Sequence, residues 1–274
     1  MGSSQLSLCM SAPCTAAVPP ELTPWQRHHG TWVKRDDLYA VAGVCGGKAR
    51  TCWQLAQGAT GLVTAGSRAS PQVNIVAHVA AALGLPCRVH TPTGKASAEV
   101  ADAVSVGATR IAHRAGYNSV IVARAREDAA ARGWQLIPFG MECSEAVAAT
   151  AAQVAQVPGD IGRLVVPVGS GMSLAGILWG LHTGAAAGHH HLPVLGVVVG
   201  AAPERRLDRW APPEWRRHVT LARSPHDYHQ AAPATRLGSL VLDAHYEAKA
   251  LPHLAPDDAL WVVGIRRTAA VAAV

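Results

Sequence analysis

Short apolar runs alternate with amphipathic segments through the first half of the chain. The predicted strands of this half lie at residues 31–34, 61–65, 86–90, 109–113 and 135–138. Between them hydrophobic residues recur at helical spacing, which predicts helices at residues 49–57, 72–83, 97–106 and 119–132. Strands that alternate with helices of this length predict βαβ units and a mostly parallel sheet flanked by helices.

The second half predicts a further α/β unit. Its elements are helices at 144–157 and 174–181 and strands at 163–168, 193–199 and 259–265. Between the last two strands the pattern weakens, with a charged, tryptophan-bearing stretch at 205–217 and a loop rich in proline and histidine at 224–234. We therefore expect two α/β domains. A smaller domain, residues 51–142, is inserted in a larger one formed by residues 1–50 and 143–274.

Composition narrows the class of protein. Of the 274 residues, 49% are hydrophobic and 15% are charged, which allows a sizeable core and excludes disorder as the dominant state. No apolar run reaches the roughly 18 residues of a membrane span. Residues 1–15 form a serine-rich leader without the pattern of a secretory signal. We expect a cytoplasmic protein with no membrane partner.

The net charge excludes fewer classes of protein than the composition does, and the cysteines and histidines indicate no particular site. The formal net charge of +6 is compatible with polyanionic partners and equally with an enzyme that handles phosphates and carboxylates. The six cysteines are scattered, so neither a disulfide framework nor a zinc module is indicated. The histidines at 28–29, 189–191, 226 and 229 lack further ligands at defined spacing, and we expect no metal site.

A glycine-rich loop joins the predicted strand 163–168 to the helix that follows. Its sequence is Gly169-Ser170-Gly171-Met172-Ser173. Free backbone N–H groups at a helix N-terminus bind anions, and glycine lets the backbone approach a phosphate closely. The loop matches neither of the common nucleotide-binding fingerprints. It predicts a phosphate site, although a tight strand-to-helix turn without a ligand accounts for it equally well.

A lysine follows a second glycine bend, in Gly46-Gly47-Lys48. A lysine that is partly desolvated on a rigid bend has a lowered pKa and can form a Schiff base with an aldehyde. A phosphate cradle and such a lysine together meet the minimal requirement for binding pyridoxal 5'-phosphate (PLP). Taken alone, Lys48 is more simply interpreted as a solvated surface lysine.

Four motifs occur in an order that resembles one group of enzymes. They are KRDDL at 34–38 with GGKAR at 46–50, GSRAS at 66–70, GSG at 169–171 and DAHYEAKA at 243–250. In this order they are similar to the motifs of fold-type-II PLP enzymes, in the group of 1-aminocyclopropane-1-carboxylate (ACC) deaminase and D-cysteine desulfhydrase. The resemblance implies two α/β domains like those of the tryptophan synthase β-subunit, with PLP in the cleft between them.

The resemblance also implies roles for single residues. Lys48 is implied to anchor PLP and shuttle protons, Ser70 to bind the substrate carboxylate, and Tyr246 to lie near the substrate amine or leaving group. The implied contacts of the cofactor phosphate are Gly169, Ser170, Gly171 and Ser173. Glu247 stands where deaminase-type members contact the pyridine nitrogen, which favours carbanion chemistry. Tyr228 is similar to a further tyrosine of the family and is a candidate substrate contact.

Two departures from the family pattern concern the substrate pocket. Pro71 stands where the family has an asparagine that contacts the cofactor, and Gln72 and Asn74 are the candidates to replace it. The region 180–246 is shorter than in the family. We therefore expect a rebuilt substrate pocket.

These observations predict a PLP-dependent lyase or deaminase that acts on a small amino acid through Lys48 and forms a homodimer. A PLP-dependent decarboxylase, racemase or β-replacement enzyme is an alternative, on an amino acid that is free or attached to a larger acceptor such as a modified nucleobase. A non-catalytic scaffold or polyanion-binding protein that keeps the fold is another. The arginines at 205–217, with Trp210 and Trp215, offer a nucleic-acid surface, but a solvated helix face is the favoured interpretation.

Overall fold

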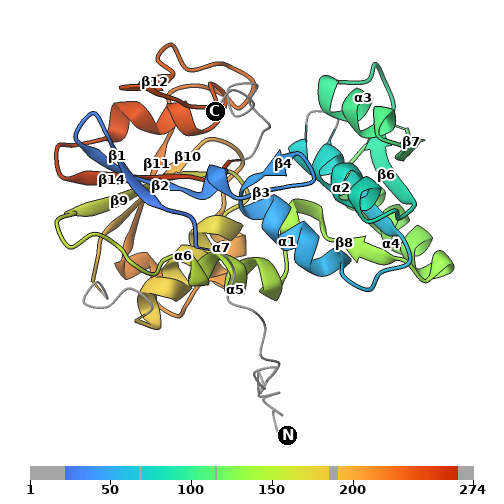
Figure 1. The fold of residues 1–274 in the computed structure, drawn as a ribbon, viewed down its shortest axis with the longest axis horizontal. Helices are drawn as coiled ribbons and strands as arrows, with labels where there is room; N and C mark the ends of the chain where they lie inside the picture. Colours follow the sequence, from blue (N-terminus) through green and yellow to red (C-terminus); the bar gives the residue numbers. More distant parts are fainter. Residues whose placement is uncertain (1–21, 68–69, 115, 185–190, 265–274) are drawn as a thin grey trace, which may run out of the picture.

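The computed structural model describes residues 22–67, 70–114, 116–184 and 191–264. Two α/β units lie side by side, each with its own sheet, and helix α1 (Gly46–Ala56) lies between them (Figure 1). The expected fold class is confirmed, because both sheets are mostly parallel and are flanked by helices. The expected serine-rich leader, residues 1–15, lies outside the described residues.

The larger unit is built on a six-stranded sheet. In spatial order its strands are β1 (Trp25–His28), β2 (Thr31–Arg35), β14 (Asp258–Val262), β9 (Arg163–Val168), β10 (Val194–Val198) and β11 (Val219–Arg223). Neighbouring strands are parallel except β1 and β2. The central strands β14, β9 and β10 are almost entirely buried. Burial on both faces explains their nearly continuous apolar sequences.

Both faces of this sheet are covered. On one side lie α5 (Ser144–Ala152), α6 (Met172–His182) and α7 (Glu204–Trp210), and the short 3-10 helix η3 (Trp215–Arg217) leads from α7 to β11. On the other side lie the 3-10 helix η4 (Glu247–His253) and the hairpin of β12 (Arg236–Leu237) and β13 (Leu240–Val241) (Figure 1). The core between these layers includes Trp261, which is fully buried.

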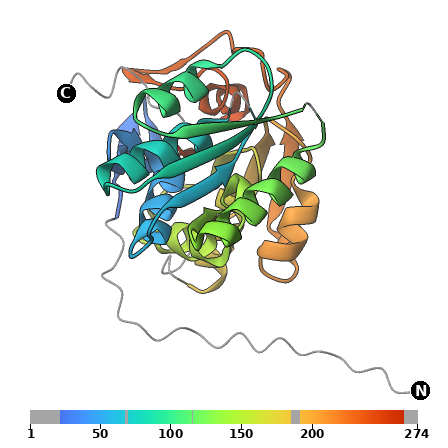
Figure 2. The same cartoon turned by 90° about the vertical axis from the view of Figure 1, so that its right-hand side faces the viewer.

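The smaller unit is built on a four-stranded parallel sheet. In spatial order its strands are β7 (Thr109–His113), β6 (Cys87–Pro92), β5 (Leu62–Ala65) and β8 (Gln135–Ile137). The helices α2 (Pro71–Ala82) and α3 (Ala98–Ser105) cover one face, and α4 (Asn118–Arg132) covers the other (Figure 2). Successive side chains of β5 point to opposite faces of the sheet. Leu62 packs with Val73 of α2, whereas Val63 packs with Ile121 of α4.

The elements between β2 and β5 connect the two units. They are the 3-10 helix η1 (Asp36–Leu38), the short strands β3 (Ala40–Val41) and β4 (Val44–Cys45), and α1. The buried residues Ala49, Cys52 and Ala56 of α1 share a core with the four-stranded sheet. The expected domain boundary at residue 51 therefore falls inside a helix that packs with the smaller unit. The chain returns through the 3-10 helix η2 (Phe139–Met141), next to the expected boundary at 142.

The expected strands and helices are present. The differences concern their ends, two edge strands of the larger sheet and the two-residue strands β3, β4, β12 and β13, which the sequence pattern did not predict. The helix expected at 144–157 ends at Ala152, and Gln156 has a φ of +63°, which an α-helix cannot continue through. The last strand ends at Val262, and residue 265 lies outside the described part. The edge strands β1 and β11 are absent from the prediction. They are half-exposed and mix polar with apolar residues, so they lack the apolar run of a buried strand.

No helix in the described part of the chain combines the length and apolar character that crossing a membrane requires.

Candidate active site

A cavity lies between the two units, at the carboxyl ends of strands from both sheets. Its volume is about 630 Å³, which is within the range of small-molecule sites. Its walls come from the residues that follow β5, β8, β9, β10, β11 and β14, together with side chains of α1, α4 and α7. Ligands of open α/β sheets bind outside the carboxyl ends of the strands, so this cavity is the candidate active site.

The cavity brings together most of the site residues expected from the sequence. Those that line it are Lys48, Ser70, Gln72, Gly169, Ser170, Gly171, Ser173, Tyr228 and Tyr246. Asn74 and Glu247 are not among the lining residues.

Lys48 reaches the cavity from the first turn of α1, and two glycines hold that turn against the end of β14. Gly46 has a φ of +84°, and a Cβ there would collide with the carbonyl oxygen of Gly264. The N–H of Gly47 donates to the carbonyl oxygen of Val263 over 3.3 Å. Only glycine permits the approach at Gly46. The close packing of α1 on β14 thus explains the glycine bend before Lys48.

The surroundings of Lys48 favour its neutral amine. Burial, together with the positive charge of Arg206, lowers the pKa of Lys48 from 10.5 to about 8. About a tenth of the amine is then neutral at pH 7, against fewer than about one in a thousand for an ordinary exposed lysine. The neutral amine is the form that attacks an aldehyde and that accepts a proton. Lys48 is therefore suited to covalent attachment of an aldehyde and to proton transfer.

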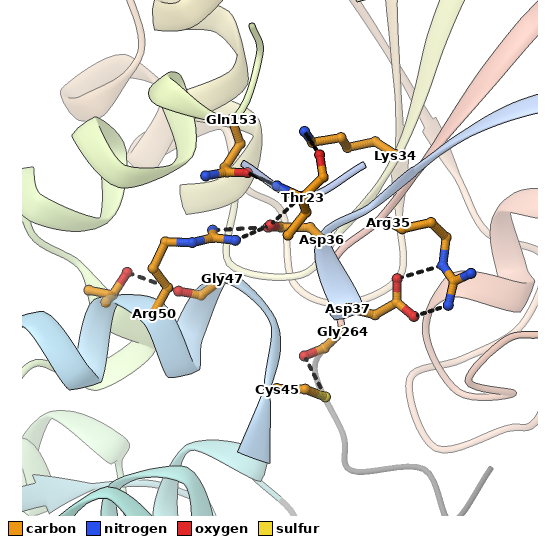
Figure 3. Close-up of polar contacts among 11 residues, drawn as sticks. Thr23, Lys34, Arg35, Asp36, Asp37, Cys45, Gly47, Arg50, Gln153 and Gly264 are labelled. Atoms are coloured by element: carbon orange, nitrogen blue, oxygen red, sulfur yellow. Dashed lines mark hydrogen bonds and ion pairs between the residues drawn. The ribbon is translucent and has the colours of Figure 1, made fainter. Parts of the chain in front are cut away.

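A buried ion pair fixes α1 to the end of β2. The guanidinium of Arg50 pairs with the carboxylate of Asp36, which also accepts a hydrogen bond from Thr23 Oγ1 over 3.3 Å. Next to it, Arg35 donates two hydrogen bonds to Asp37, of 2.9 Å from Nε and 2.7 Å from Nη2 (Figure 3). The KRDDL and GGKAR segments, separate in sequence, thus form one polar contact under the helix that carries the lysine.

The glycine loop 169–171 leads from β9 into α6 and forms another wall. Gly171 has a φ of +91°, and a Cβ there would lie 3.1 Å from Pro203 Cβ. The first N–H groups of a helix have no partner within it, and the helix N-terminus carries partial positive charge. The hydroxyl-bearing residues Ser170 and Ser173 line the same wall. This wall is suited to holding a phosphate.

Tyr246 connects this loop to the segment before η4. Its hydroxyl oxygen accepts the N–H of Gly169 over 2.8 Å. A Cβ on Gly169 would lie 2.9 Å from that oxygen, so the phenol occupies the space that a larger residue would need. The ring is nearly buried and lines the cavity. Tyr246 therefore both supports the loop and faces a bound molecule.

Ser70 begins α2 at the edge of the cavity. Its Oγ accepts the N–H of Gln72 over 3.3 Å and caps the helix. Pro71 occupies the first helical position, where its missing N–H costs no helical hydrogen bond. The departure from the family asparagine at Pro71 is thus compatible with the local helix geometry.

The side-chain amide of Gln72 is already engaged. Its Nε2 donates to Thr64 Oγ1 over 2.9 Å and to the carbonyl oxygen of Pro138 over 2.7 Å. Its Oε1 accepts the N–H of Gly140 over 2.8 Å. Gln72 therefore joins α2, β5 and the turn after β8. It supports the cavity wall without a free amide group for a ligand.

Two expected site residues are directed away from the cavity. Asn74 lies on the face of α2 that meets α3, and its Nδ2 donates to Asp102 Oδ2 over 3.3 Å. Glu247 is 2% exposed, and its Oε1 accepts the N–H of Gly264 over 2.9 Å. Burial, and secondly the negative charge of Asp243, raise the pKa of Glu247 to about 8. At neutral pH Glu247 is thus mainly an uncharged acid that holds the end of β14.

Tyr228 is held at the cavity by a buried lysine. The Nζ of Lys249 donates to the carbonyl oxygen of Asp227 over 2.7 Å and to that of Tyr228 over 3.3 Å. Lys249 is fully buried and belongs to the DAHYEAKA segment. Two segments that resemble family motifs are therefore joined in space, as in the case of KRDDL and GGKAR.

Sequence reasoning missed Asn118, Arg206, Arg223 and His226, which also line the cavity. Arg223 is the last residue of the edge strand β11, and His226 follows it. A predicted strand there would have placed them at the carboxyl end of the sheet. Arg206 belongs to the stretch 205–217 that the sequence favours as a solvated helix face, and no pattern in the sequence separates it from its neighbours.

Three other arginines of this stretch, Arg209, Arg216 and Arg217, lie close to acidic side chains. Arg216 donates to Asp208, and Arg217 pairs with Glu214 over 2.8 Å. These pairs are exposed and contribute little to stability. They reduce the positive charge that a polyanion would meet.

Potential metal ligands are dispersed over the described part of the chain. There, no group of three or more His, Cys, Asp or Glu side chains is arranged to hold a metal ion. Of the histidine run at 189–191, the first two residues lie outside the described part, as do Cys9 and Cys14.

The residues of the cavity fit PLP. The lysine with a lowered pKa, the N-terminal loop of α6 and the hydroxyl groups of Ser70, Ser170 and Tyr246 surround one space of suitable size. Lys48 would hold the aldehyde carbon, and loop 169–171 would hold the phosphate.

Comparison with known proteins agrees with this chemistry. Residues 20–247 match the family described as "Pyridoxal-phosphate dependent enzyme". Among curated proteins, no significant match is found.

Solved structures include several with the same fold. An ACC deaminase homologue has a TM-score of 0.74 at 21% identity, with 90% of each chain covered. A serine racemase from Dictyostelium discoideum has a TM-score of 0.62 at 11% identity and covers 88% of this chain and 91% of its own. An L-serine ammonia-lyase from Rhizomucor miehei has a TM-score of 0.61 at 16% identity, with coverages of 88% and 92%.

At these identities the likeness establishes the fold, which is that of fold-type-II PLP enzymes. The family match extends over most of the sequence, and it agrees with the resemblance found in the motifs. This chain belongs to the family of pyridoxal-phosphate-dependent enzymes.

Proposed function

We propose that this enzyme is a lyase that deaminates a small amino acid and releases ammonia and a 2-oxo acid. The observation that carries the proposal is the arrangement of Lys48, loop 169–171 and Ser70 around one cavity. They supply a covalent anchor, an anion cradle and a polar group at a helix N-terminus for a carboxylate. A small amino acid needs no more than these to be held with its Cα beside the lysine.

Different residues of the cavity would carry out different steps of the reaction. PLP, when bound, withdraws electrons from the bonds at the substrate Cα and so acidifies the Cα proton. Lys48, once the substrate amine has taken its place, accepts that proton at Nζ. Ser70 holds the substrate carboxylate, and Tyr246 supplies a proton to the group that leaves Cβ with its bonding electrons. Lys48 Nζ would then take its original place again and so release the product as an enamine, which water hydrolyses to ammonia and the 2-oxo acid.

The names of the structural neighbours support this class of reaction. An ACC deaminase homologue and an L-serine ammonia-lyase are both named for the release of ammonia. A serine racemase and an aspartate racemase are also among the neighbours, and these favour racemisation as the second candidate.

Cofactor attachment is tested first. The purified protein is mixed with PLP, its absorption spectrum is recorded, and the complex is reduced with borohydride and digested. We expect an absorption band of the bound cofactor and a reduced adduct on the peptide that contains Lys48. Lys48→Ala should lose both. An adduct on a different lysine, or no adduct, contradicts the proposal and favours the scaffold alternative.

The reaction is tested on the loaded enzyme with a panel of small D- and L-amino acids. Ammonia and 2-oxo acid are quantified, and the remaining amino acid is analysed on a chiral column. Equal amounts of ammonia and 2-oxo acid support deamination. Formation of the opposite enantiomer without ammonia would support racemisation instead, and loss of carbon dioxide would indicate a decarboxylase.

A further inference from the structure

Arg206 differs from the other arginines of the stretch 205–217. Its side chain is 32% exposed and lines the cavity, whereas those of Arg209, Arg216 and Arg217 are 60–72% exposed and do not. A guanidinium that lines a cavity is a permanent positive charge for a molecule that binds there.

The Arg206 side chain is held in place through one edge of its guanidinium. Its Nε donates to Glu142 Oε2 over 3.0 Å, and Glu142 Oε1 in turn accepts the indole N–H of Trp210 over 3.2 Å. Within the described ranges, the two terminal nitrogens of Arg206 make no hydrogen bond. Glu142 thus orients the group while its other edge stays available for an acceptor.

The segments that carry Arg206 and Glu142 both lie close to the glycine loop 169–171. Pro203, just before α7, is in contact range of Gly171, and a Cβ on Gly171 would lie 3.1 Å from Pro203 Cβ. On the other side, a Cβ on Gly140 would lie 3.7 Å from Ser170 Cβ, and Gly140 is two residues from Glu142. The ion pair of Arg206 with Glu142 therefore joins two segments that lie close to the loop.

We propose that Arg206 is a phosphate-binding residue, which donates hydrogen bonds from its terminal nitrogens to the phosphate of PLP. Two parallel N–H groups of arginine match the spacing of two phosphate oxygens, and such charge-assisted pairs are stronger than neutral ones. The loop supplies backbone N–H groups, and Arg206 supplies one full positive charge opposite the two negative charges of the phosphate dianion. This inference rests on the cofactor assignment and is independent of which reaction the enzyme performs.

The test compares ligands with and without the phosphate group. Apo wild type, Arg206→Ala, Arg206→Lys and the control Arg209→Ala are each titrated with PLP and with pyridoxal, and binding is followed by absorption. Arg209 lies on the same helix, 3.8 Å from Glu142, but outside the cavity. We expect Arg206→Ala to weaken PLP binding about 10- to 100-fold and to leave pyridoxal binding within about 2-fold. Arg209→Ala should behave like wild type.

Competition by inorganic phosphate gives a second readout. Phosphate should displace PLP from wild type at lower concentration than it displaces PLP from Arg206→Lys, because lysine cannot form the two parallel hydrogen bonds. If Arg206→Ala does not fold, as judged by circular dichroism, the Arg206→Lys titrations decide the question.

Equal weakening of PLP and pyridoxal would overturn the proposal and assign Arg206 a structural role with Glu142. Unchanged PLP affinity in both variants would overturn it as well. Failure of the cofactor assignment itself is distinguishable, because wild type would then bind neither PLP nor pyridoxal.

Discussion

Arg50 and Asp36 form a buried ion pair between α1 and the residue that follows β2, and their side chains are 5% and 2% exposed. The pair connects α1, which packs with the smaller unit, to the end of a strand of the larger unit. Arg50 lies two residues after Lys48 in the sequence. In an apolar environment each charge offsets the cost of removing the other from water. Removal of one partner leaves the other unpaired, at a cost of about 3–5 kcal/mol.

Asp36→Asn should therefore lower the free energy of unfolding by about 3 kcal/mol. Urea unfolding of the apo protein at pH 7, followed by circular dichroism, measures the change. The double variant Asp36→Asn with Arg50→Met removes both charges at similar volume and should recover a large part of the loss. Equal destabilisation of the single and double variants would show that the charges are not the cause.

The second prediction concerns the glycine bend before Lys48. Gly46→Ala puts a methyl group on a residue with a φ of +84°, in collision with the carbonyl oxygen of Gly264. Gly58 offers a matched control, since it has a φ of +74° and no atom lies within 4 Å of the position that a methyl group would take there. Gly58→Ala should cost about 1–2 kcal/mol from backbone strain alone.

We expect Gly46→Ala to cost more than about 3 kcal/mol, because collision adds to the same strain. It should also displace α1 and reduce the yield of the borohydride-trapped PLP adduct on Lys48. The comparison uses thermal unfolding and adduct mass analysis of both variants. If Gly46→Ala and Gly58→Ala lost similar amounts of stability and gave similar adduct yields, the close packing of α1 on β14 would be contradicted.

The parts of the site that lie in recognisable motifs were predictable. Taken singly, neither the glycine loop nor Lys48 was decisive, and it was the order of four motifs along the chain that implied the site. Lys48 and loop 169–171 both line the cavity. Elements with continuous apolar runs, such as β9, were equally clear because burial on both faces leaves a simple pattern.

The direction of a side chain in an irregular segment was not predictable. Tyr246 and Glu247 are neighbours, yet Tyr246 lines the cavity while Glu247 turns to the N–H of Gly264. No periodicity distinguishes them at the start of a short 3-10 helix. Arg206 was missed for a similar reason. Its place at the cavity depends on Glu142, which is far from it in sequence.

Capture of an aldehyde by Lys48 should follow its lowered pKa. Because the neutral amine reacts, trapping of pyridoxal by cyanoborohydride on the Lys48 peptide should rise with pH and be half-maximal near pH 8. In the urea-unfolded chain the midpoint should lie near 10.4. A midpoint near 10 in the folded protein would contradict this environment.

Glu247 should make the stability of the apo protein depend on pH. Its pKa is raised to about 8 in the folded chain by burial and secondly by Asp243, against about 4.3 in the unfolded chain. Between these values the folded chain holds one more proton than the unfolded chain, so its stability falls as pH rises from about 4 to 8 and is level above. Glu247→Gln is uncharged throughout, and its Oε1 can still accept the N–H of Gly264. Relative to wild type, it should therefore gain on the order of 4 kcal/mol between pH 4.5 and pH 8.5 in urea unfolding. If the unfolding free energies of wild type and Glu247→Gln changed with pH in parallel, Glu247 would be ionised in the folded protein at neutral pH.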